Sequence, residues 1–283
     1  MTPILTISII TPSFNQAVYL EQTIQSVINQ NYPAIEYIII DGGSTDGSVE
    51  VIKKYDSHIT YWVSEKDKGQ SDAINKGLKL ANGDIVCWLN SDDLFEPNTL
   101  NTIAQFFNEH ADAHFVYGDG VIFYENGKKR DSHCKPGKVS HGVLSRCDPL
   151  QQPSTFWRRA IHEDIGFIDE SLFFTMDWDF FMRVALKYEM HYLPISFSRY
   201  RIHDAHKTGS GAVRRSQEVL GFVDRYGSDD YINLFRAIYP YADEIRRLRS
   251  KFGWRLGRLV FYVTHPKLAS TYGLKLRAAM DMY

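Results

Sequence analysis

The stretch IVCWLNSDD, from Ile85 to Asp93, decides the fold. Five apolar residues run directly into four polar ones, and a short continuous apolar run is typical of a strand buried on both faces. Its polar end should leave the sheet at the carboxyl edge, where open α/β sheets bind ligands. Asp92 and Asp93 repel each other there unless a proton or a hard cation such as Mg²⁺ or Mn²⁺ relieves them. The alternative is an Asx-type turn that caps a helix beginning at Pro97.

Strands and helices alternate on both sides of this stretch. The segments between the apolar runs carry apolar residues at helical spacing, and we predict strands at residues 7–11, 35–40, 59–63, 85–89 and 115–117. This alternation predicts an α/β fold with a doubly wound, mainly parallel sheet and right-handed crossovers. The polar strand ends should converge on one edge as a binding cleft, namely residues 12–15, 41–46, 65–69 and 90–93.

The second half of the chain is less regular. We expect a helix over residues 177–187, and an edge strand over 190–201 because that segment contains Pro194. From Gln217 onward the sequence is mostly helical in pattern and more basic.

Composition narrows the class of protein. A chain of 283 residues suits one large α/β domain, or one domain with an appendage, and 44% hydrophobic residues argue against disorder. A net charge of -2 gives no reason to expect a nucleic acid partner. Three cysteines without CxxC spacing favour a reducing compartment. With neither a signal peptide pattern nor a bilayer-spanning run, a cytoplasmic location is expected.

Several motifs together resemble glycosyltransferase family 2. TPSFN at 11–15, DGGSTDGS at 41–48, EKDKGQSDAINKG at 65–77 and LNSDD at 89–93 occur in that family's order, and FIDESL at 167–172, DWDFFMR at 177–183 and YRIH at 200–203 resemble its acceptor half. The resemblance covers about residues 5–210. It implies a GT-A fold, a nucleotide-sugar donor, Mn²⁺ or Mg²⁺, and inversion at the anomeric carbon.

The resemblance also suggests how the chain is divided. We expect a GT-A domain over residues 1–213 and a helical extension over residues 214–283. Within the domain, residues 1–120 would bind the nucleotide sugar and residues 121–213 would bind the acceptor.

The resemblance places the nucleotide base between Asp41 and the segment that contains Thr11, Pro12 and Phe14. A carboxylate at Asp41 can accept the N3–H of uracil or thymine, which adenine and cytosine lack, so UDP- or dTDP-sugars are the expected donors. The alternative is that Asp41 only opens the turn at Gly42-Gly43.

Other acidic residues in this half have two interpretations. Asp67 and Asp72 are expected to line the donor pocket, although Asp72 could instead complement the dipole of the helix that follows. Asp46 fits a helix cap better than a ligand.

The resemblance assigns the metal site to the family's DXD motif, here in the form Ser91-Asp92-Asp93. Asp92 would lie near the ribose or the metal and Asp93 on the metal, with Asn90 and Ser91 also on the donor side. The cation would neutralise the diphosphate and so improve the leaving group.

The resemblance points to Asp177 as the general base that takes the acceptor's proton. The family's pattern has an acidic residue where this chain has Met176, so Asp179 remains an alternative, with an acceptor role. His203 aligns with a histidine that approaches the metal or the diphosphate in relatives, and His206 is its rival. The polar run at residues 204–210 could fold over the donor.

Two further features are open between function and structure. Gln152 precedes an apolar run and could bind a sugar acceptor or belong to the core. Residues 246–263 form a basic amphipathic pattern that could lie on the inner face of a membrane as a peripheral contact, or could pack on the protein or a second subunit.

These observations predict an inverting, metal-dependent glycosyltransferase that acts on a hydroxyl of a saccharide or lipid-linked saccharide, in surface polysaccharide or glycoconjugate synthesis. A sugar nucleotidyltransferase is the alternative enzyme, but residues 11–15 contain neither the glycine nor the cation of a triphosphate loop. The third interpretation is a nucleotide-sugar-binding domain without catalysis.

Overall fold

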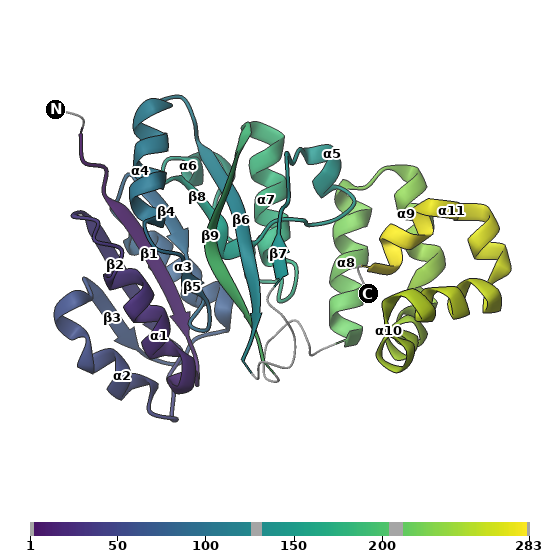
Figure 1. Ribbon diagram of the computed structural model, residues 1–283, viewed down its shortest axis with the longest axis horizontal. Helices are drawn as coiled ribbons and strands as arrows, with labels where there is room; N and C mark the ends of the chain where they lie inside the picture. Colours follow the sequence, from purple (N-terminus) through teal and green to yellow (C-terminus); the bar gives the residue numbers. More distant parts are fainter. Residues whose placement is uncertain (1–2, 126–131, 204–211, 282–283) are drawn as a thin grey trace. The chain divides into compact units, whose positions relative to one another are not determined.

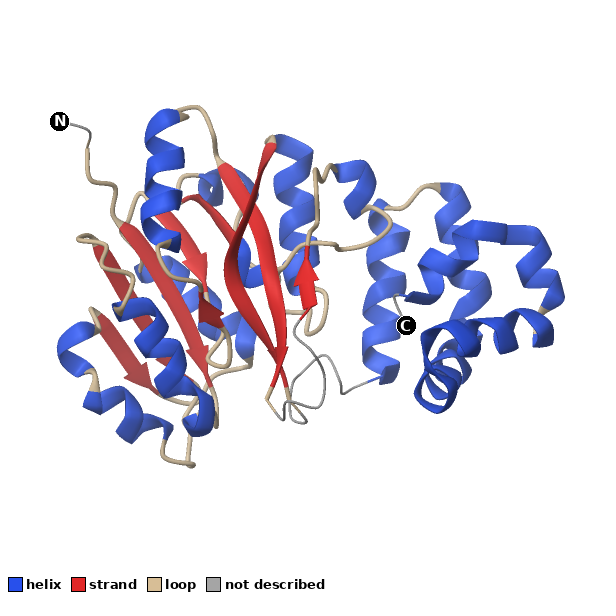
Figure 2. Ribbon diagram, viewed as in Figure 1, coloured by secondary structure: helices blue, strands red, loops and turns tan. Residues whose placement is uncertain are grey.

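Nine strands form a single sheet in the computed structural model, which describes residues 3–125, 132–203 and 212–281 (Figures 1 and 2). The strands are β1 (Ile7–Ser13), β2 (Ile35–Asp41), β3 (Tyr61–Ser64), β4 (Ile85–Trp88), β5 (Leu94–Phe95), β6 (Phe115–Tyr124), β7 (Ser132–Cys134), β8 (Thr155–Arg158) and β9 (Met190–Ile202). The helices are α1 (Ala17–Ile28), α2 (Ser48–Lys54), α3 (Gln70–Leu80), α4 (Thr99–Glu109), α5 (His141–Leu144), α6 (Ile161–Ile165), α7 (Met176–Lys187), α8 (Ala212–Tyr226), α9 (Asp229–Ile238), α10 (Ala242–Thr264) and α11 (Pro266–Asp281).

The sheet is parallel at one end and mixed at the other. Its strand order is β3-β2-β1-β4-β8-β6-β9-β5, with β7 added on β6. The first four strands of that order run parallel to one another, whereas β8 is antiparallel to both of its neighbours. The predicted mainly parallel α/β fold is confirmed, and the antiparallel strand closes the parallel half against β6.

Helices cover both faces of the parallel half (Figure 2). On one face, α1 and α4 bury Leu20, Ile24 and Ile103 in a core that also contains Ile9 of β1. On the other face, α3 lies so close to β1 that a Cβ atom on Gly77 would come within 2.4 Å of an Ile10 methyl carbon. The strands are therefore buried from both sides, as their uninterrupted apolar sequences require.

The predicted edge position of the strand at residues 190–201 is wrong. β9 pairs with β6 on one side, and Ser198 and Arg199 pair with β5 on the other. The register with β6 shifts between Leu193 and Ser196. This irregularity accommodates Pro194, which has no N–H group to contribute to a ladder.

The helix predicted to begin at Pro97 begins at Thr99. Asn98 precedes it with φ 66°, a left-handed conformation that Asn adopts more readily than most residues. A few residues before α4, Leu94 and Phe95 form β5, a strand too short to show the alternation of polar and apolar residues by which strands are predicted.

The chain separates into two compact units that are interleaved in sequence. The first comprises Met1–Ser140, Pro149–Ser171 and Arg183–His203, and contains the sheet. The second comprises His141–Asp148, Leu172–Met182 and Asp204–Tyr283, so α7 contributes to both. The single division predicted after residue 213 stays a prediction. Among the described helices, none combines the length and the apolarity needed to cross a bilayer.

Candidate functional site

The first unit brings four polar segments to one edge of the sheet. β1, β2, β3 and β4 are parallel, so the residues that follow them leave at the same edge. β1 separates β2 from β4, which places the ends of β2 and β4 about 10 Å apart at the usual strand spacing. The carboxyl ends of parallel strands are where α/β sheets bind ligands, so this edge is the candidate site.

The segment after β4 is a tight turn held by a network of side-chain amides. The Asp93 N–H donates to the carbonyl of Asn90 at 3.1 Å, which closes the turn. The Asn90 amide accepts from Gln70 at 2.7 Å and donates to Gln152 at 3.1 Å. Gln152 in turn donates to the carbonyl of Trp88 at 2.8 Å. Asn90 therefore has a fixed orientation, and it holds the turn to both α3 and the segment before β8.

Gln152 thus has a defined place in the sheet. It is 8% exposed, and its amide is bonded at both ends within this network. Its neighbours Thr155–Arg158 form β8, in agreement with the core alternative for this stretch.

Asp92 points out of the turn and meets His203. The Asp92 Oδ2 atom lies 3.0 Å from His203 Nε2, although the two residues are 111 positions apart in sequence. The Asp92 side chain is 20% exposed, whereas that of His203 is 1% exposed and lies against the Tyr19 ring, with the ring centroids 4.5 Å apart. The carboxylate is therefore the more exposed member of this pair.

Asp93 points inward instead. It is 1% exposed, and its carboxyl oxygens accept from the Arg201 N–H at 3.0 Å and from the Asn90 amide at 3.1 Å. Burial, together with the nearby charge of Asp92, raises the pKa of Asp93 well above its ordinary value. In this geometry the buried Asp93 carboxyl group stabilises the turn through its bonds to Asn90 and Arg201.

The Asp92–His203 pair suits a divalent cation. Two ligand atoms about 2.1 Å from an octahedral ion and at right angles to each other lie about 3 Å apart, close to the observed 3.0 Å. Mg²⁺ in particular is often held by one or two carboxylates together with substrate phosphates. Within the described residues, no cluster of three or more His, Cys, Asp or Glu side chains could hold a metal. A cation here would therefore need oxygen ligands from a substrate or from water.

Asp41 ends β2 and is fully buried. Its carboxylate accepts from the Gly43 N–H at 3.1 Å, the Ser44 N–H at 2.9 Å, the Ser44 hydroxyl at 2.5 Å and the Ser64 hydroxyl at 2.6 Å. These four bonds make Asp41 the organiser of the turn after β2. They agree with the structural alternative for this residue, and its contact with a base stays a prediction.

The turn requires glycine at residues 42 and 43 for steric and conformational reasons. A Cβ on Gly42 would lie 2.6 Å from a carboxylate oxygen of Asp67, and Gly43 has φ 82°. Asp67 accepts the N–H of Gly69 at 2.9 Å, so it also shapes its own loop. The two loops after β2 and β3 are therefore packed directly against each other.

Asp72 and Asp46 act at helix starts. Asp72 accepts the Lys68 N–H at 3.0 Å and lies 3.5 Å from the Lys76 ammonium. Burial opposes the shift, but these two partners lower the pKa of Asp72. Asp46 accepts the N–H groups of Ala17 and Ser48, the first residues of α1 and α2, although the N-cap residue of α2 is Gly47.

The segment after β1 offers an exposed aromatic ring. Thr11 and Pro12 are buried in the strand, whereas Phe14 is 59% exposed. Ser13 is 3% exposed, and its hydroxyl has no hydrogen-bond partner among the described residues. Asn15, at φ 51°, accepts the N–H of Thr45, so the loops after β1 and β2 are joined.

Asp177 and Asp179 belong to the second unit, in the first turn of α7. Asp177 is half-buried and accepts the N–H of Trp178 at 2.9 Å. Asp179 is 1% exposed, and its carboxylate pairs with Arg225 at 3.1 Å and accepts the Tyr226 hydroxyl at 3.0 Å. Of the two, Asp177 is therefore the more accessible carboxylate.

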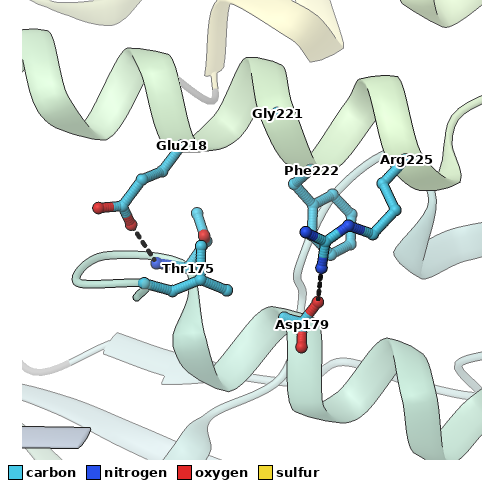
Figure 3. Close-up of a pocket in the computed structure, with 7 residues that line it drawn as sticks. Thr175, Asp179, Glu218, Gly221, Phe222 and Arg225 are labelled. Atoms are coloured by element: carbon cyan, nitrogen blue, oxygen red, sulfur yellow. Dashed lines mark hydrogen bonds and ion pairs between the residues drawn. The ribbon is translucent and has the colours of Figure 1, made fainter. Parts of the chain in front are cut away.

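A cavity of about 100 Å³ lies between α7 and α8 in this unit (Figure 3). Asp179 and Thr175 line it from the α7 side, and Glu218 and Arg225 from α8. One carboxylate, that of Glu218, accepts three consecutive N–H groups, those of Phe173, Phe174 and Thr175. The loop that leads into α7 is thus held by a single acidic side chain of α8.

Sequence reasoning missed the residues that hold these side chains in place. Arg201 donates its backbone N–H to Asp93 and its guanidinium to the Asp92 carbonyl at 2.8 Å, and Gln70 fixes Asn90. The YRIH motif contains Arg201, but nothing in its local pattern predicts these partners. The polar run at residues 204–210, which includes His206, lies outside the described residues.

The family model described as glycosyl transferase family 2 matches residues 8–187 of the chain. An uncharacterized glycosyltransferase of Rickettsia typhi is 27% identical over 267 residues, which cover 88% of this chain and 81% of the relative. An uncharacterized glycosyltransferase of Mycobacterium tuberculosis is 30% identical over 229 residues, with 80% and 85% covered. A glycosyltransferase of Mycobacterium bovis named for PGL/p-HBAD biosynthesis is 29% identical over 180 residues, with 62% and 68% covered.

Solved structures with a similar fold include proteins of S. aureus and Pyrobaculum calidifontis. S. aureus TarS in complex with UDP-GlcNAc has a TM-score of 0.62 at 18% identity, with 99% of this chain and 91% of that chain covered. The mannosyltransferase PcManGT of Pyrobaculum calidifontis, in complex with GDP-Man and Mn²⁺, has a TM-score of 0.61 at 18% identity, with 99% and 86% covered. At this level of identity the likeness concerns the fold alone.

Proposed function

The chain belongs to glycosyl transferase family 2, and from this premise we propose that it is an inverting glycosyltransferase. It moves a sugar from a UDP- or dTDP-sugar to a hydroxyl of a saccharide or lipid-linked saccharide. The observation that carries the proposal is the Asp92–His203 pair, 3.0 Å apart beside the loops that follow four parallel strands. The UDP-GlcNAc complex of TarS and the GDP-Man complex of PcManGT support a nucleotide-sugar donor. The choice of uracil or thymine rests on the proposed contact of Asp41 with the base.

In this proposal the donor lies along the sheet edge. Phe14 presents an exposed ring that can stack on the base, and Thr11, Pro12 and Asp41 would line the same part of the donor site. Asp67 and Asp72 shape the neighbouring wall of the pocket. Because the Asp41 carboxylate already accepts four hydrogen bonds, a base would have to share one of its oxygens.

Asp92 and His203 would hold Mn²⁺ or Mg²⁺, with Asn90 and Ser91 setting the turn that presents Asp92. When bound, the cation would neutralise the diphosphate and so make it a better leaving group. The imidazole ligand favours Mn²⁺ over the oxygen-preferring Mg²⁺, and the Mn²⁺ in the PcManGT structure supports this choice. We propose that Asp93, which is buried and hydrogen-bonded, supports the turn and does not contact the cation.

Asp177 would act as the general base. Its carboxylate would accept the proton of the acceptor hydroxyl while that oxygen forms a bond to the anomeric carbon and the bond to the diphosphate breaks. This single displacement inverts the anomeric centre and needs no covalent enzyme intermediate. Asp179 and Gln152, which are buried and bonded to protein groups, then act as positioning residues for α7 and for Asn90.

A role in surface polysaccharide or glycoconjugate synthesis fits this reaction. The relative named for PGL/p-HBAD biosynthesis supports a glycoconjugate product.

Donor binding can be tested with a thermal-shift screen of UDP-, dTDP- and GDP-sugars, with and without Mn²⁺. A ligand that binds only the folded chain raises the melting temperature, and the stabilisation grows with the logarithm of the ratio of ligand concentration to Kd. We expect a UDP- or dTDP-sugar to act only with Mn²⁺, and Asp92→Asn to remove the shift. Asp112→Asn, at an exposed position, is the matched control and should keep it.

Product analysis then separates the possible reactions. Release of UDP or dTDP together with a glycosylated acceptor supports the proposal. Release of pyrophosphate would indicate a nucleotidyltransferase, and binding without any product would indicate a non-catalytic domain.

A further inference from the structure

The last part of α10 exposes a stripe of apolar side chains. Leu256 is 50% exposed, Leu259 57% and Val263 73%. These three residues are called the apolar stripe below. An α-helix turns about 100° per residue, so the three side chains lie within about 60° of one another. Phe261, about 140° around the helix from Leu256, is fully buried and packs on His265. The helix thus has one face in the core of its unit and a second apolar face in solvent.

The stripe begins after a break in the helix. Gly253 has φ 72° and ψ 173°, so α10 consists of two helical pieces. Just before the break, Phe252 is 37% exposed and the Lys251 ammonium lies 5.1 Å from the centre of its ring. Lys251 and Arg255, both exposed, are called the basic flank below. Figure 1 shows α10 and α11 as consecutive helices near the C-terminus.

The charge around the stripe is of one sign. Residues 245–280 contain 9 of the 32 Lys and Arg residues of the chain and none of its 34 Asp and Glu residues. The rest of the chain therefore has 23 basic and 34 acidic residues. Arg246 and Lys275 pair with Asp243 and Asp230, so part of this charge is neutralised within the chain. The segment is still strongly basic, which makes it complementary to a partner of negative charge that also accepts apolar side chains.

We propose that the apolar stripe and the basic flank dock α10 onto the surface of an anionic lipid bilayer. The stripe would enter the boundary between headgroups and acyl chains, and the basic side chains would meet acidic headgroups. The helix would lie on the membrane, because none of the described helices is able to span one. A second copy of this chain is a poorer partner, because two such basic surfaces repel each other.

Sedimentation of the full chain with vesicles tests the proposal. We expect binding to vesicles that contain phosphatidylglycerol, weakening as salt is added, and little binding to phosphatidylcholine alone. Replacing each member of the stripe with Gln should reduce the partition coefficient by at least about tenfold per side chain. Replacing the two residues of the basic flank with Gln should reduce it by about 25-fold, or fivefold for each charge.

Matched controls come from elsewhere on the surface. Leu186 is 55% exposed on α7, and Lys53 is exposed on α2. Leu186→Gln and Lys53→Gln should leave vesicle binding unchanged. Far-ultraviolet circular dichroism checks that each variant is folded, and the single change Leu259→Gln serves if the triple variant is not.

Three outcomes would overturn the proposal. The first is that the wild-type chain does not sediment with anionic vesicles at low salt. The second is that the stripe variant binds as well as the Leu186→Gln control. The third is that the wild-type chain is a dimer in solution and the stripe variant a monomer, because the surface would then join two copies of the chain. Since lipid binding is measured without any sugar donor, its result does not depend on the proposed reaction.

Discussion

Glu218 should contribute far more to stability than its salt bridge with Arg214 alone would. Its carboxylate accepts the N–H groups of Phe173, Phe174 and Thr175 at 3.0, 2.6 and 3.2 Å. Phe173 and Phe174 are half-buried residues, so in Glu218→Ala their amides should regain water, at a cost of about 1 kcal/mol each. Thr175 is 4% exposed, so its amide stays unpaired and costs about 2 kcal/mol more. We therefore expect a loss of about 4 kcal/mol in the free energy of unfolding of this unit.

Urea denaturation followed by circular dichroism measures this loss, and hydrogen exchange of residues 172–182 locates it. Arg214→Ala is the matched control. It removes the cation 3.0 Å from Glu218, and with it the contact 4.6 Å from the centre of the Phe173 ring, but it leaves the three amide bonds. The Arg214 side chain is 56% exposed. It should cost no more than about 1 kcal/mol. Glu218→Gln, which keeps one acceptor oxygen, should fall between the two variants.

The same substitution should affect the reaction. Asp177 follows the clamped loop by two residues, so loosening that loop should lower kcat and leave the KM of the donor nearly unchanged. If Glu218→Ala is no less stable than Arg214→Ala, and the amides of residues 173–175 exchange no faster, then Glu218 does not hold this loop and the reasoning fails.

Three further predictions rest on other parts of the structure. Asp177→Asn should keep the wild-type melting temperature and lower kcat by about 100-fold or more, and near-wild-type turnover would remove Asp177 as the base. Gly77→Ala should lower the free energy of unfolding by about 1–3 kcal/mol, because the new Cβ meets Ile10. Gly221→Ala in α8 has open space around the new Cβ and should raise the free energy of unfolding by up to about 1 kcal/mol. Equal urea midpoints for the two variants would contradict this. Burial lowers the pKa of His162 below 6.5, so the unfolded chain binds a proton at this imidazole more readily than the folded chain, and stability falls as the pH drops below 6.5. His162→Gln should therefore reduce the dependence of the free energy of unfolding on pH below 6.5. A dependence identical to that of the wild-type chain would contradict this.

The parallel half of the sheet was predictable because its signal is local. The apolar run of β4 and the helical spacing before Leu78 each reflect burial of a continuous segment. The convergence of the strand ends then follows from parallel topology alone. β5 and the interior position of β9 were not predictable in this way, because a two-residue strand has no period and Pro194 suggested an edge.

The fine geometry of the site depends on contacts between distant residues. Asp92 and Asp93 are adjacent and chemically identical, yet one meets His203 near solvent and the other is buried under Arg201. No spacing rule distinguishes them, because the difference depends on contacts with Arg201 in β9 and with His203 just after it. The same holds for Glu218, whose three amide partners lie more than 40 positions away.

The claim that Asp92 and His203 hold the cation can be measured without a sugar acceptor. Free Mn²⁺ is titrated by electron paramagnetic resonance in the presence of UDP, for the wild-type chain and for Asp92→Asn and His203→Ala. We predict that the wild-type chain retains Mn²⁺ together with the nucleotide, and that both variants lose this retention while Asp112→Asn keeps it. Retention in Asp92→Asn equal to that of the wild-type chain would contradict the account.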